Sequence, residues 1–210
     1  ALLETSSGIT ITLEWGDEGN MLISSSFLSS YGAQDSKTIA WDMVNYVEVW
    51  SRANEDKFNL ALDYLWLPNS PYILGGNGSG DIFLIDTGTG EVEKNQTIES
   101  SSPNFRPHLF IYAFCQEIGG NVIAITDFGV YRVNTIDLSH DLVIPNNTSP
   151  GDCNHNSTVL VNPKGYLTRL DTSSENIISL ENNRLLPYRA YDYLDMTVKW
   201  NPVYPIIASY

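Results

Sequence analysis

The hydrophobic pattern of the chain is clearest near its N-terminus, where apolar and polar residues alternate strictly. Residues 8–15 place threonine and glutamate on one face and four apolar side chains on the other: Ile9, Ile11, Leu13 and Trp15. This period predicts a β-strand with one apolar face. A turn rich in Gly and Asp at 16–20 and an apolar run at 21–23 follow. A hairpin is therefore one way in which this first strand can be paired.

After this region the chain divides into short apolar runs separated by Gly, Asn and Pro. Residues 38–50 fit both a helical face and an alternating strand, and we interpret this region as a strand. The run at 58–66 alternates well and is ended by Pro68. Further short strands are predicted at 72–74, 81–86, 109–114, 121–125, 130–133, 158–161, 166–170 and 177–180.

Many short strands with turn signals between them predict an all-β fold. We expect an antiparallel, sandwich-like body, with a β-propeller-like body as the alternative. Residues 80–87, 129–135 and 165–172 favour the alternative, because each consists of a glycine, a short apolar-rich strand and an Asx-Thr turn, as in the hairpins of propeller blades. The spacings between the three glycines, 49 and 36 residues, are unequal, whereas a repeat array keeps a fixed period.

The charge balance excludes several classes of partner. The 210 residues carry 25 acidic and 11 basic side chains, a net charge of -14. Such a chain repels phosphate backbones and anionic lipids, so no nucleic acid is expected as a partner. No run approaches the ~20 apolar residues of a spanning helix, which argues against membrane insertion. The start at Ala1, without methionine, is interpreted as the removal of a signal peptide, so we expect a secreted protein at the cell surface.

Two cysteines, Cys115 and Cys153, are the only thiols of the chain. An even number of cysteines in a secreted protein favours a disulfide, which here would close a loop of about 39 residues. Two unrelated buried thiols are the alternative.

N-glycosylation is the modification that the sequence predicts most strongly. The acceptor motif Asn-x-Ser/Thr occurs five times, beside Gly, Pro or Ser loops in which a sugar could stand in solvent. The acceptor asparagines are Asn77, Asn95, Asn146, Asn147 and Asn156. The adjacent Asn146 and Asn147 cannot easily both be modified, and the alternative for each site is an ordinary turn asparagine. Apart from these N-linked glycans we expect no cofactor.

No motif of a known catalytic apparatus is present. The chain has no Gly-x-Ser-x-Gly elbow and no phosphate-binding glycine loop. Its three histidines, His108, His140 and His155, lack the spacing of metal ligands, so no metal site is predicted. A pair of carboxylates for glycoside hydrolysis leaves no spacing signature. We therefore expect a protein that is not an enzyme, with a carboxylate-pair hydrolase as the minor alternative.

The alternating first strand after a polar leader, the all-β body, the sequons and the low charge together resemble the subunits of extracellular filaments built by donor-strand complementation, such as the thread filaments of thermoacidophilic archaea. The resemblance implies that residues 1–15 form a tail with a donor strand and residues 16–210 a β-rich globular body. The donated strand would complete the sheet of the next copy, and its apolar side chains would fill pockets there. The partners would be copies of the same chain in a head-to-tail homopolymer.

The leading expectation is thus a non-enzymatic structural subunit of a glycosylated surface filament. Two alternatives stay open. The first strand can pair within its own chain, through the turn at 16–20 with residues 21–23. The protein can instead be a secreted receptor- or carbohydrate-binding β domain, since aromatic side chains stack on sugars as well as filling sheets.

Overall fold

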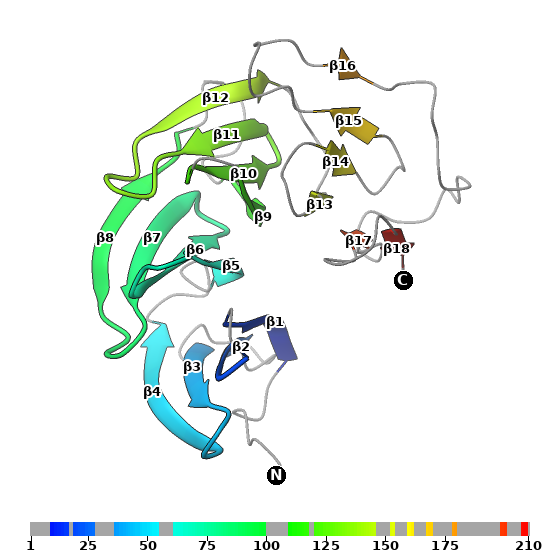
Figure 1. Cartoon of the computed structure of the whole chain (residues 1–210). Coiled ribbons are helices and arrows are strands. Elements are labelled where there is room, and N and C mark those ends of the chain that lie inside the picture. The colour runs from blue at the N-terminus through cyan, green and yellow to red at the C-terminus, as the bar shows by residue number, and fades with distance from the viewer. Residues whose placement is uncertain are drawn as a thin grey trace. The chain divides into compact units, whose positions relative to one another are not determined.

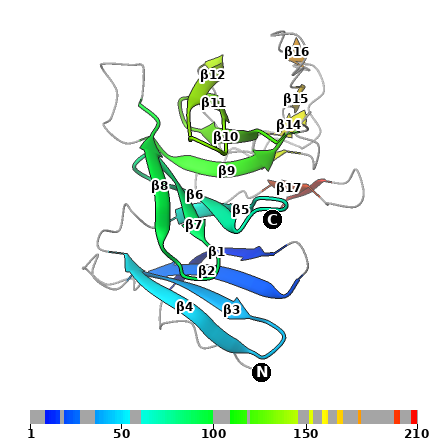
Figure 2. The same ribbon diagram turned by 60° about the vertical axis from the view of Figure 1, so that its left-hand side comes forward.

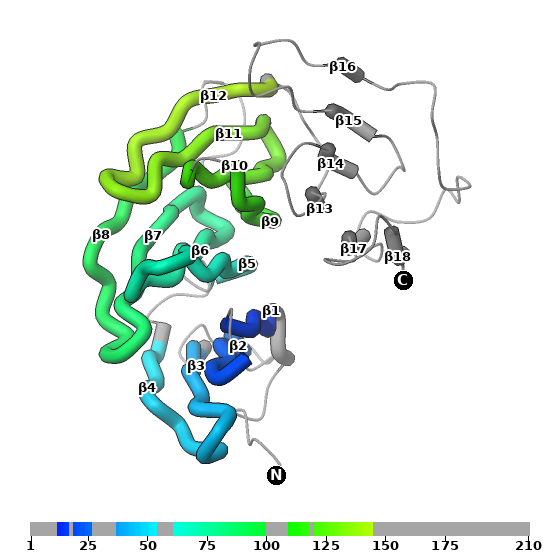
Figure 3. The backbone as a smooth tube through the Cα atoms, viewed as in Figure 1, coloured from blue at the N-terminus to red at the C-terminus, as the bar shows by residue number. Residues whose placement is uncertain are grey.

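The structure, a computed structural model, describes most of the first 145 residues. The described segments are 9–16, 19–27, 36–54, 61–99, 109–117 and 120–145, followed by short strands only (Figure 3). The chain divides into two compact units, Ala1–Ile111 and Tyr112–Tyr210. The boundary between the units falls at the start of a strand.

The strands described up to residue 145 form three sheets of four strands each (Figure 1). The first contains β1 (Ile9–Trp15), β2 (Met21–Phe27), β3 (Ser36–Asp42) and β4 (Val47–Asn54). The second contains β5 (Ala61–Trp66), β6 (Tyr72–Asn77), β7 (Asp81–Asp86) and β8 (Val92–Thr97). The third contains β9 (Ile111–Gln116), β10 (Val122–Thr126), β11 (Gly129–Val133) and β12 (His140–Pro145).

Shorter strands follow in the remainder of the chain. A further four-stranded sheet contains β13 (Asp152–Cys153), β14 (Val159–Val161), β15 (Leu167–Arg169) and β16 (Ile178–Ser179). A two-stranded sheet contains β17 (Val198–Trp200) and β18 (Ile207–Ser209).

Each four-stranded sheet is an antiparallel meander in which the order of strands in space equals their order in the chain. The described residues contain no helix, and none of them forms an apolar helical segment of the length needed to cross a membrane. The predicted all-β fold is confirmed. Repeated four-stranded meanders are the organisation of the propeller-like alternative, in which each sheet is one blade.

The first two sheets pack face to face within the first unit (Figure 2). Alternation along β2 and β3 turns Ile23 and Ala40 toward the second sheet, where they share one core with Ile73, Phe83 and Ile85. Burial of each large apolar side chain in such a core contributes roughly 1.5–3 kcal/mol. The packing of sheet on sheet therefore stabilises the first unit.

A polar cluster is buried inside this apolar core. The Tyr64 hydroxyl on β5 lies 2.9 Å from Ser25 Oγ and 3.1 Å from Thr38 Oγ1, and these two oxygens are 2.9 Å apart. Burial raises the pKa of the Tyr64 phenol, while its bonds to the two hydroxyls act in the opposite direction. Satisfied polar groups of this kind fix one register of packed strands. The cluster explains why the serine-rich end of β2 is a buried strand.

The third sheet has its own core in the second unit. Alternate residues of β9 and β10, including Ala113, Cys115 and Ile123, are buried together with Val130 of β11. An ion pair lies at one end of this sheet, where Arg132 Nε and Nη2 donate to the buried Glu117 carboxylate at 2.9 and 3.0 Å. This two-point geometry holds β9 and β11 in place.

The first strand is confirmed, and the structure pairs it within its own chain. β1 is antiparallel to β2 through the turn at 16–20, with Trp15 opposite Leu22 and Glu14 opposite Ile23. This is the internal hairpin that was left open as an alternative to donation. β1 is an edge strand of its sheet, and Leu13 and Trp15 on it are exposed.

The three segments that resemble one another occupy equivalent places. Residues 80–87, 129–135 and 165–172 contain β7, β11 and β15, and each of these is the third strand of its sheet. Their similarity therefore reports a structural repeat.

Two regions differ from the predicted strands. Residues 38–50, interpreted as a single strand, contain the end of β3, a turn at 43–46 and the start of β4. The outer strand β8 was missed because its sequence, Val-Glu-Lys-Asn-Gln-Thr, lacks a regular apolar pattern. Its burial pattern explains this, since every residue after Val92 is exposed.

Candidate functional site

The third and fourth strands of each of the first three sheets are joined by the same turn. Its first residue is Asp42, Asp86 or Asn134, and its Oδ1 accepts a hydrogen bond from the backbone N–H two positions later, at 2.8, 3.0 and 2.8 Å. In the two aspartate turns the next N–H donates to the same oxygen, at 3.0 and 2.8 Å. The side chain thus replaces strand pairing at the tip of each hairpin.

The fifth residue of each turn has a positive φ. The angle is 56° at Tyr46, 76° at Gly90 and 62° at Leu138. Glycine adopts this conformation without steric cost, whereas other L-residues are disfavoured by about 1–2 kcal/mol. Two of the three turns therefore hold a strained residue at the same position.

The surroundings of this position differ between the three turns. Leu138 is fully buried, so its side chain offsets the strain by burial. At Gly90 a Cβ atom would lie 2.6 Å from the Trp50 ring, so glycine is required both by the positive φ and by the close approach of the ring. Tyr46 is 56% exposed. Its strain is not offset by burial of the side chain.

The β3–β4 turn carries an exposed cluster of apolar side chains. We call this cluster the apolar hairpin tip and define it as Val44, Tyr46, Val47 and Val49. Val44 is 65% exposed at the apex, and the two valines that follow Tyr46 are exposed on β4. Single exposed apolar residues are common on protein surfaces, whereas neighbouring ones that form a patch mark a contact surface, and this group of four is the candidate for one.

The turn that holds the tip is well ordered by its own polar groups. Asp42 accepts hydrogen bonds from the backbone N–H groups of Val44 and Asn45, and Asn45 Nδ2 donates to Asp42 Oδ2 at 2.7 Å. The side-chain bond from Asn45, followed by the two backbone bonds, lowers the pKa of the Asp42 carboxyl below 3.8. The carboxylate therefore stays ionised and keeps the turn closed at neutral pH.

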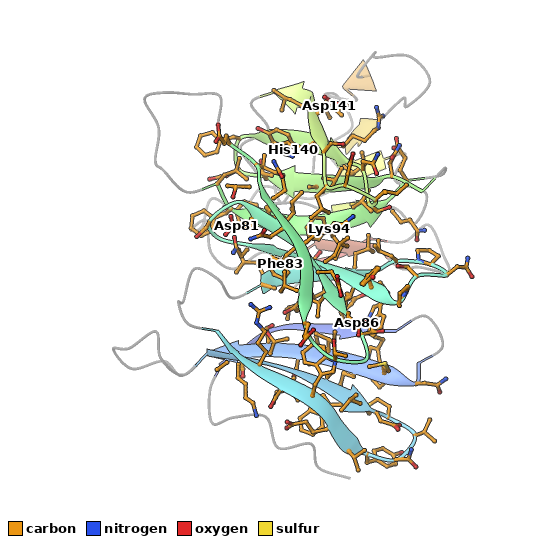
Figure 4. The ribbon with its side chains drawn as sticks, turned by 90° about the vertical axis from the view of Figure 1, so that its left-hand side faces the viewer. Asp81, Phe83, Asp86, Lys94, His140 and Asp141 are labelled. Atoms are coloured by element: carbon orange, nitrogen blue, oxygen red, sulfur yellow. The ribbon has the colours of Figure 1, made fainter. Side chains whose placement is uncertain are left out.

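β4 anchors the base of the tip to the second sheet. Trp50 is buried, and its Nε1 donates to the backbone oxygen of Thr87 at 2.8 Å. Its ring packs against Gly90 in the β7–β8 turn. Asp86, which opens that turn, lies at the opposite end of β7 from Asp81 (Figure 4). The hairpin tip is thus carried by a fixed scaffold, as binding loops usually are.

Charged and aromatic groups also gather on the third sheet. Burial and then the charge of Asp127 raise the pKa values of the Tyr112 and Tyr131 phenols. Tyr131 meets the His140 ring edge to face at 6.0 Å. Within the described segments no group of three His, Cys, Asp or Glu side chains could hold a metal ion. These contacts are accounted for by packing of the sheet.

The two described sequons differ sharply. Asn77 is buried: its Nδ2, the atom that would carry a glycan, donates to Asp81 Oδ2 at 3.0 Å, and its Oδ1 accepts from the N–H groups of Ser79 and Asp81 at 2.9 Å. Asn95 is exposed on the outer strand β8. A glycan on Asn77 would require its turn to open, whereas Asn95 is free of this obstacle.

Other predicted sites are placed only in part. Cys115 is buried on β9, and the side chain of Cys153 on β13 lies outside the described residues, so the disulfide stays a prediction. Asn146, Asn147 and Asn156 also lie outside the described residues. The side chains of Ile9 and Ile11 are not described, and Leu13 and Trp15 are exposed.

The apolar hairpin tip was missed by sequence reasoning. Its valines were interpreted only as part of a strand, because alternation in residues 46–50 has the same period on a buried and on an exposed edge. The signal that could have found it is the match between Asp42, four residues before Tyr46, and Asp86, four residues before Gly90. That match identifies a turn even where no glycine or proline is present.

The chain matches no family model and no curated protein. Among solved structures it is similar to the WD40 repeats of RRP9, with a TM-score of 0.65 and 11% identity over 84% of this chain and 52% of that one. It is also similar to the β-propeller domain of Cps50 (Swd1) from Myceliophteria thermophila, with a TM-score of 0.57 and 13% identity over 94% and 61% of the two chains. The chain thus spans about half to three fifths of the length of these structures. At this identity the likeness shows the fold alone, and it is that of a β-propeller.

Proposed function

We propose that this chain, with the fold of WD40-type β-propellers, is a non-catalytic protein-binding module that contacts its partner through the apolar hairpin tip. The observation that carries this proposal is the exposure of Val44, Tyr46, Val47 and Val49 on a turn that Asp42 holds closed. Aromatic side chains in a small apolar group are typical centres of protein interfaces. The proposal belongs to the alternative of a receptor- or carbohydrate-binding β domain from the sequence, with a protein as the ligand.

A comparison of two hairpins tests this function. The double variant Val44→Asp, Val47→Asp places two charges on the tip, and Asn95→Asp, Gln96→Asp places two on the exposed polar strand β8 as a matched control. Proteins retained by the wild-type chain from its native source would be quantified by mass spectrometry, and the retained partner would then be purified and its affinity measured. We expect the double variant to lose the partner and the control to keep it. Equal binding by all three proteins would refute the role of the tip.

A filament subunit is the second candidate function, carried by a different observation. β1 is an edge strand, and Leu13 and Trp15 on it are exposed, so a second chain could be engaged there. Secretion, glycans and head-to-tail copies belong to this proposal. Leu13→Asp, Trp15→Asp charges the exposed side chains of β1 without removing the strand from its sheet, and it is expected to abolish fibres seen by electron microscopy and leave a folded protein. Fibres that form equally well from this variant would refute the filament proposal.

A further inference from the structure

The strain at Tyr46 is the feature of the hairpin tip that folding does not explain. Three turns of the same design place a positive φ at their fifth residue. Glycine occupies that position in the β7–β8 turn, and a fully buried leucine occupies it in the β11–β12 turn. Tyr46 is not a glycine, and its large side chain is more than half exposed, so neither flexibility nor burial offsets the strain. Glycine or asparagine would fit this backbone better.

Strain that persists in a bulky, exposed residue indicates a role outside the fold, because residues in sparsely populated conformations gather at binding and switch sites. We propose that Tyr46 is the anchor residue of the apolar hairpin tip and that its partner is a protein surface rich in lysine and arginine. This inference rests on the proposed function and assigns both the central contact and the class of partner.

The net negative charge of the first unit favours a partner rich in lysine and arginine. Residues 1–111 contain fifteen acidic and five basic side chains, a net charge of −10. Beside the tip the Glu48 carboxylate lies 3.7 Å from Lys37 Nζ, so these two charges largely offset one another, and the Asp42 carboxylate that closes the turn supplies negative charge there. A field of this sign attracts basic proteins and accelerates their encounter with the chain.

The same charge opposes a second copy as the occupant of the tip. Two chains that each carry a net charge of -14 repel one another, so self-association through this surface would need to overcome that repulsion. A basic partner gains instead from the field, and its lysine or arginine side chains can stack on the exposed ring of Tyr46 in a cation–π contact. The ring and the neighbouring valines thus fit an apolar surface rimmed by positive charge.

The first test separates the anchor role from a structural role. Tyr46→Asn and Tyr46→Gly both suit a positive φ, so we expect their thermal unfolding midpoints to equal or exceed that of the wild-type chain. Leu138→Gly is the matched control, because it relieves the same backbone conformation but removes a buried side chain, and its midpoint is expected to fall. A clear fall in the midpoint of both Tyr46 variants would show that the ring serves folding and would overturn the inference.

The second test uses a displayed library of random peptides as the probe, panned on the full chain. We expect enriched peptides to carry net positive charge and to lose affinity by about thirtyfold on Tyr46→Asn, the loss that is typical of an interface hot spot. Enrichment of neutral or acidic peptides, or absence of any peptide that depends on Tyr46, would overturn the inference. The affinities would be measured at low and at high salt, because salt screens the attraction between the acidic chain and a basic peptide, and all such peptides are expected to bind more weakly at high salt.

Further variants distinguish the failure of this inference from that of the proposed function. If Val44→Asp, Val47→Asp abolishes peptide binding while Tyr46→Asn does not, the tip is a binding surface and Tyr46 is not its anchor. If neither change affects binding, the proposed function itself fails. Sedimentation of the chain alone gives the remaining outcome: concentration-dependent association that Tyr46→Asn removes would show a second copy as the occupant and would refute the basic partner.

Discussion

The β3–β4 and β7–β8 hairpins have the same turn and present opposite surfaces. In both, an aspartate accepts hydrogen bonds from two backbone N–H groups of the tip. The β7–β8 tip consists of Thr, Gly, Thr and Gly, whereas the β3–β4 tip presents Val44 and Tyr46 to solvent. Because the aspartate and the backbone fix the turn, the remaining tip residues can vary without loss of the hairpin. The apolar surface of the β3–β4 tip is therefore not required for folding.

The outer strands that follow these turns differ in the same way. On β8 the exposed residues are polar or charged, including Glu93, Lys94 and Asn95. Charged residues on an edge strand prevent uncontrolled pairing with other chains. β4 also exposes charged residues, Glu48 and Arg52, but next to the tip it exposes Val47 and Val49 as well. The exposed apolar residues thus distinguish β4 from β8.

The largest effect is expected from making the β7–β8 turn resemble the β3–β4 turn. Gly90→Ala places a Cβ atom where it would lie 2.6 Å from the Trp50 ring, at a φ of +76°. Strain and overpacking together are expected to lower the free energy of unfolding by about 3 kcal/mol. Urea unfolding followed by tryptophan fluorescence would measure this. A loss below about 1 kcal/mol would show that Trp50 moves aside easily and that the two turns are not held as the comparison requires.

A smaller effect is expected from the contact that joins the two hairpins. Trp50→Phe removes the hydrogen bond of 2.8 Å to the Thr87 oxygen and part of the buried ring. We expect a loss of about 2 kcal/mol of unfolding free energy. Trp15→Phe is the matched control, since Trp15 is exposed, and it should change stability by less than about 0.5 kcal/mol. Equal losses in the two variants would contradict the assigned role of Trp50.

The turn aspartates predict a weaker, pH-dependent effect. Hydrogen bonds from Asn45 hold the pKa of Asp42 below 3.8, and the backbone bond from Thr89 is the main cause that lowers the pKa of Asp86. A carboxyl with a lowered folded-state pKa stabilises the fold above its unfolded pKa, and this stabilisation is lost as the pH falls through the folded-state value. In an NMR titration each carboxyl should titrate below pH 3.8, and the signals of the amides bonded to that carboxyl should change over the same pH range.

Asp42→Asn provides the control for this pH dependence. The amide oxygen can still accept both backbone bonds, so the turn is expected to persist, and the acid-dependent change in the Val44 and Asn45 amide signals should disappear. Persistence of that change in the variant would assign it to another group.

The sequence predicted the type of structure well where alternation was strong and turns held glycine. The first strand was found, as were β7, β11 and β15, whose Gly and Asx-Thr signals mark equivalent places in three sheets. The overall architecture was harder to predict, because the repeated signal lies in short turns and strands, and the number of residues between these signals varies. The three similar segments favoured the propeller-like alternative. Their unequal spacing is the reason why it was placed second to the sandwich-like body.

The remaining features depend on contacts that no local pattern reveals. The apolar run noted in the sequence ends at residue 23, yet β2 continues through the buried serines that follow, and Ser25 lies within 2.9 Å of the Tyr64 hydroxyl on the second sheet. Val47 and Val49 lie in the region that was interpreted as a strand, and both are exposed. In both cases the decisive partner lies far away in the chain or is absent from the residues that the structure describes. Alternation identified the strands, but it could not tell which edge is covered.

The smallest effect on stability is expected at Asn95, the sequon on the outer strand β8. When the chain is made in a secretory host, we expect Asn95 to carry a glycan and Asn77 to be unmodified, because Asn77 Nδ2 is bonded to Asp81 in a buried turn. Peptide mass mapping before and after enzymatic removal of the glycan would decide this. A glycan on β8 would further shield that edge and leave β4 as the accessible one.

Matched substitutions at the two sequons separate a modified surface asparagine from a structural one. Asn95→Gln is expected to remove the added mass and to change the free energy of unfolding by less than about 0.5 kcal/mol. Asn77→Gln displaces an amide that makes three hydrogen bonds of 2.9–3.0 Å, and a loss of about 2 kcal/mol is expected without any change in mass attributable to sugar. A glycan found on Asn77 would mean that its turn is open when the sugar is attached, and that the Asn77–Asp81 bond forms too late or too weakly to protect it.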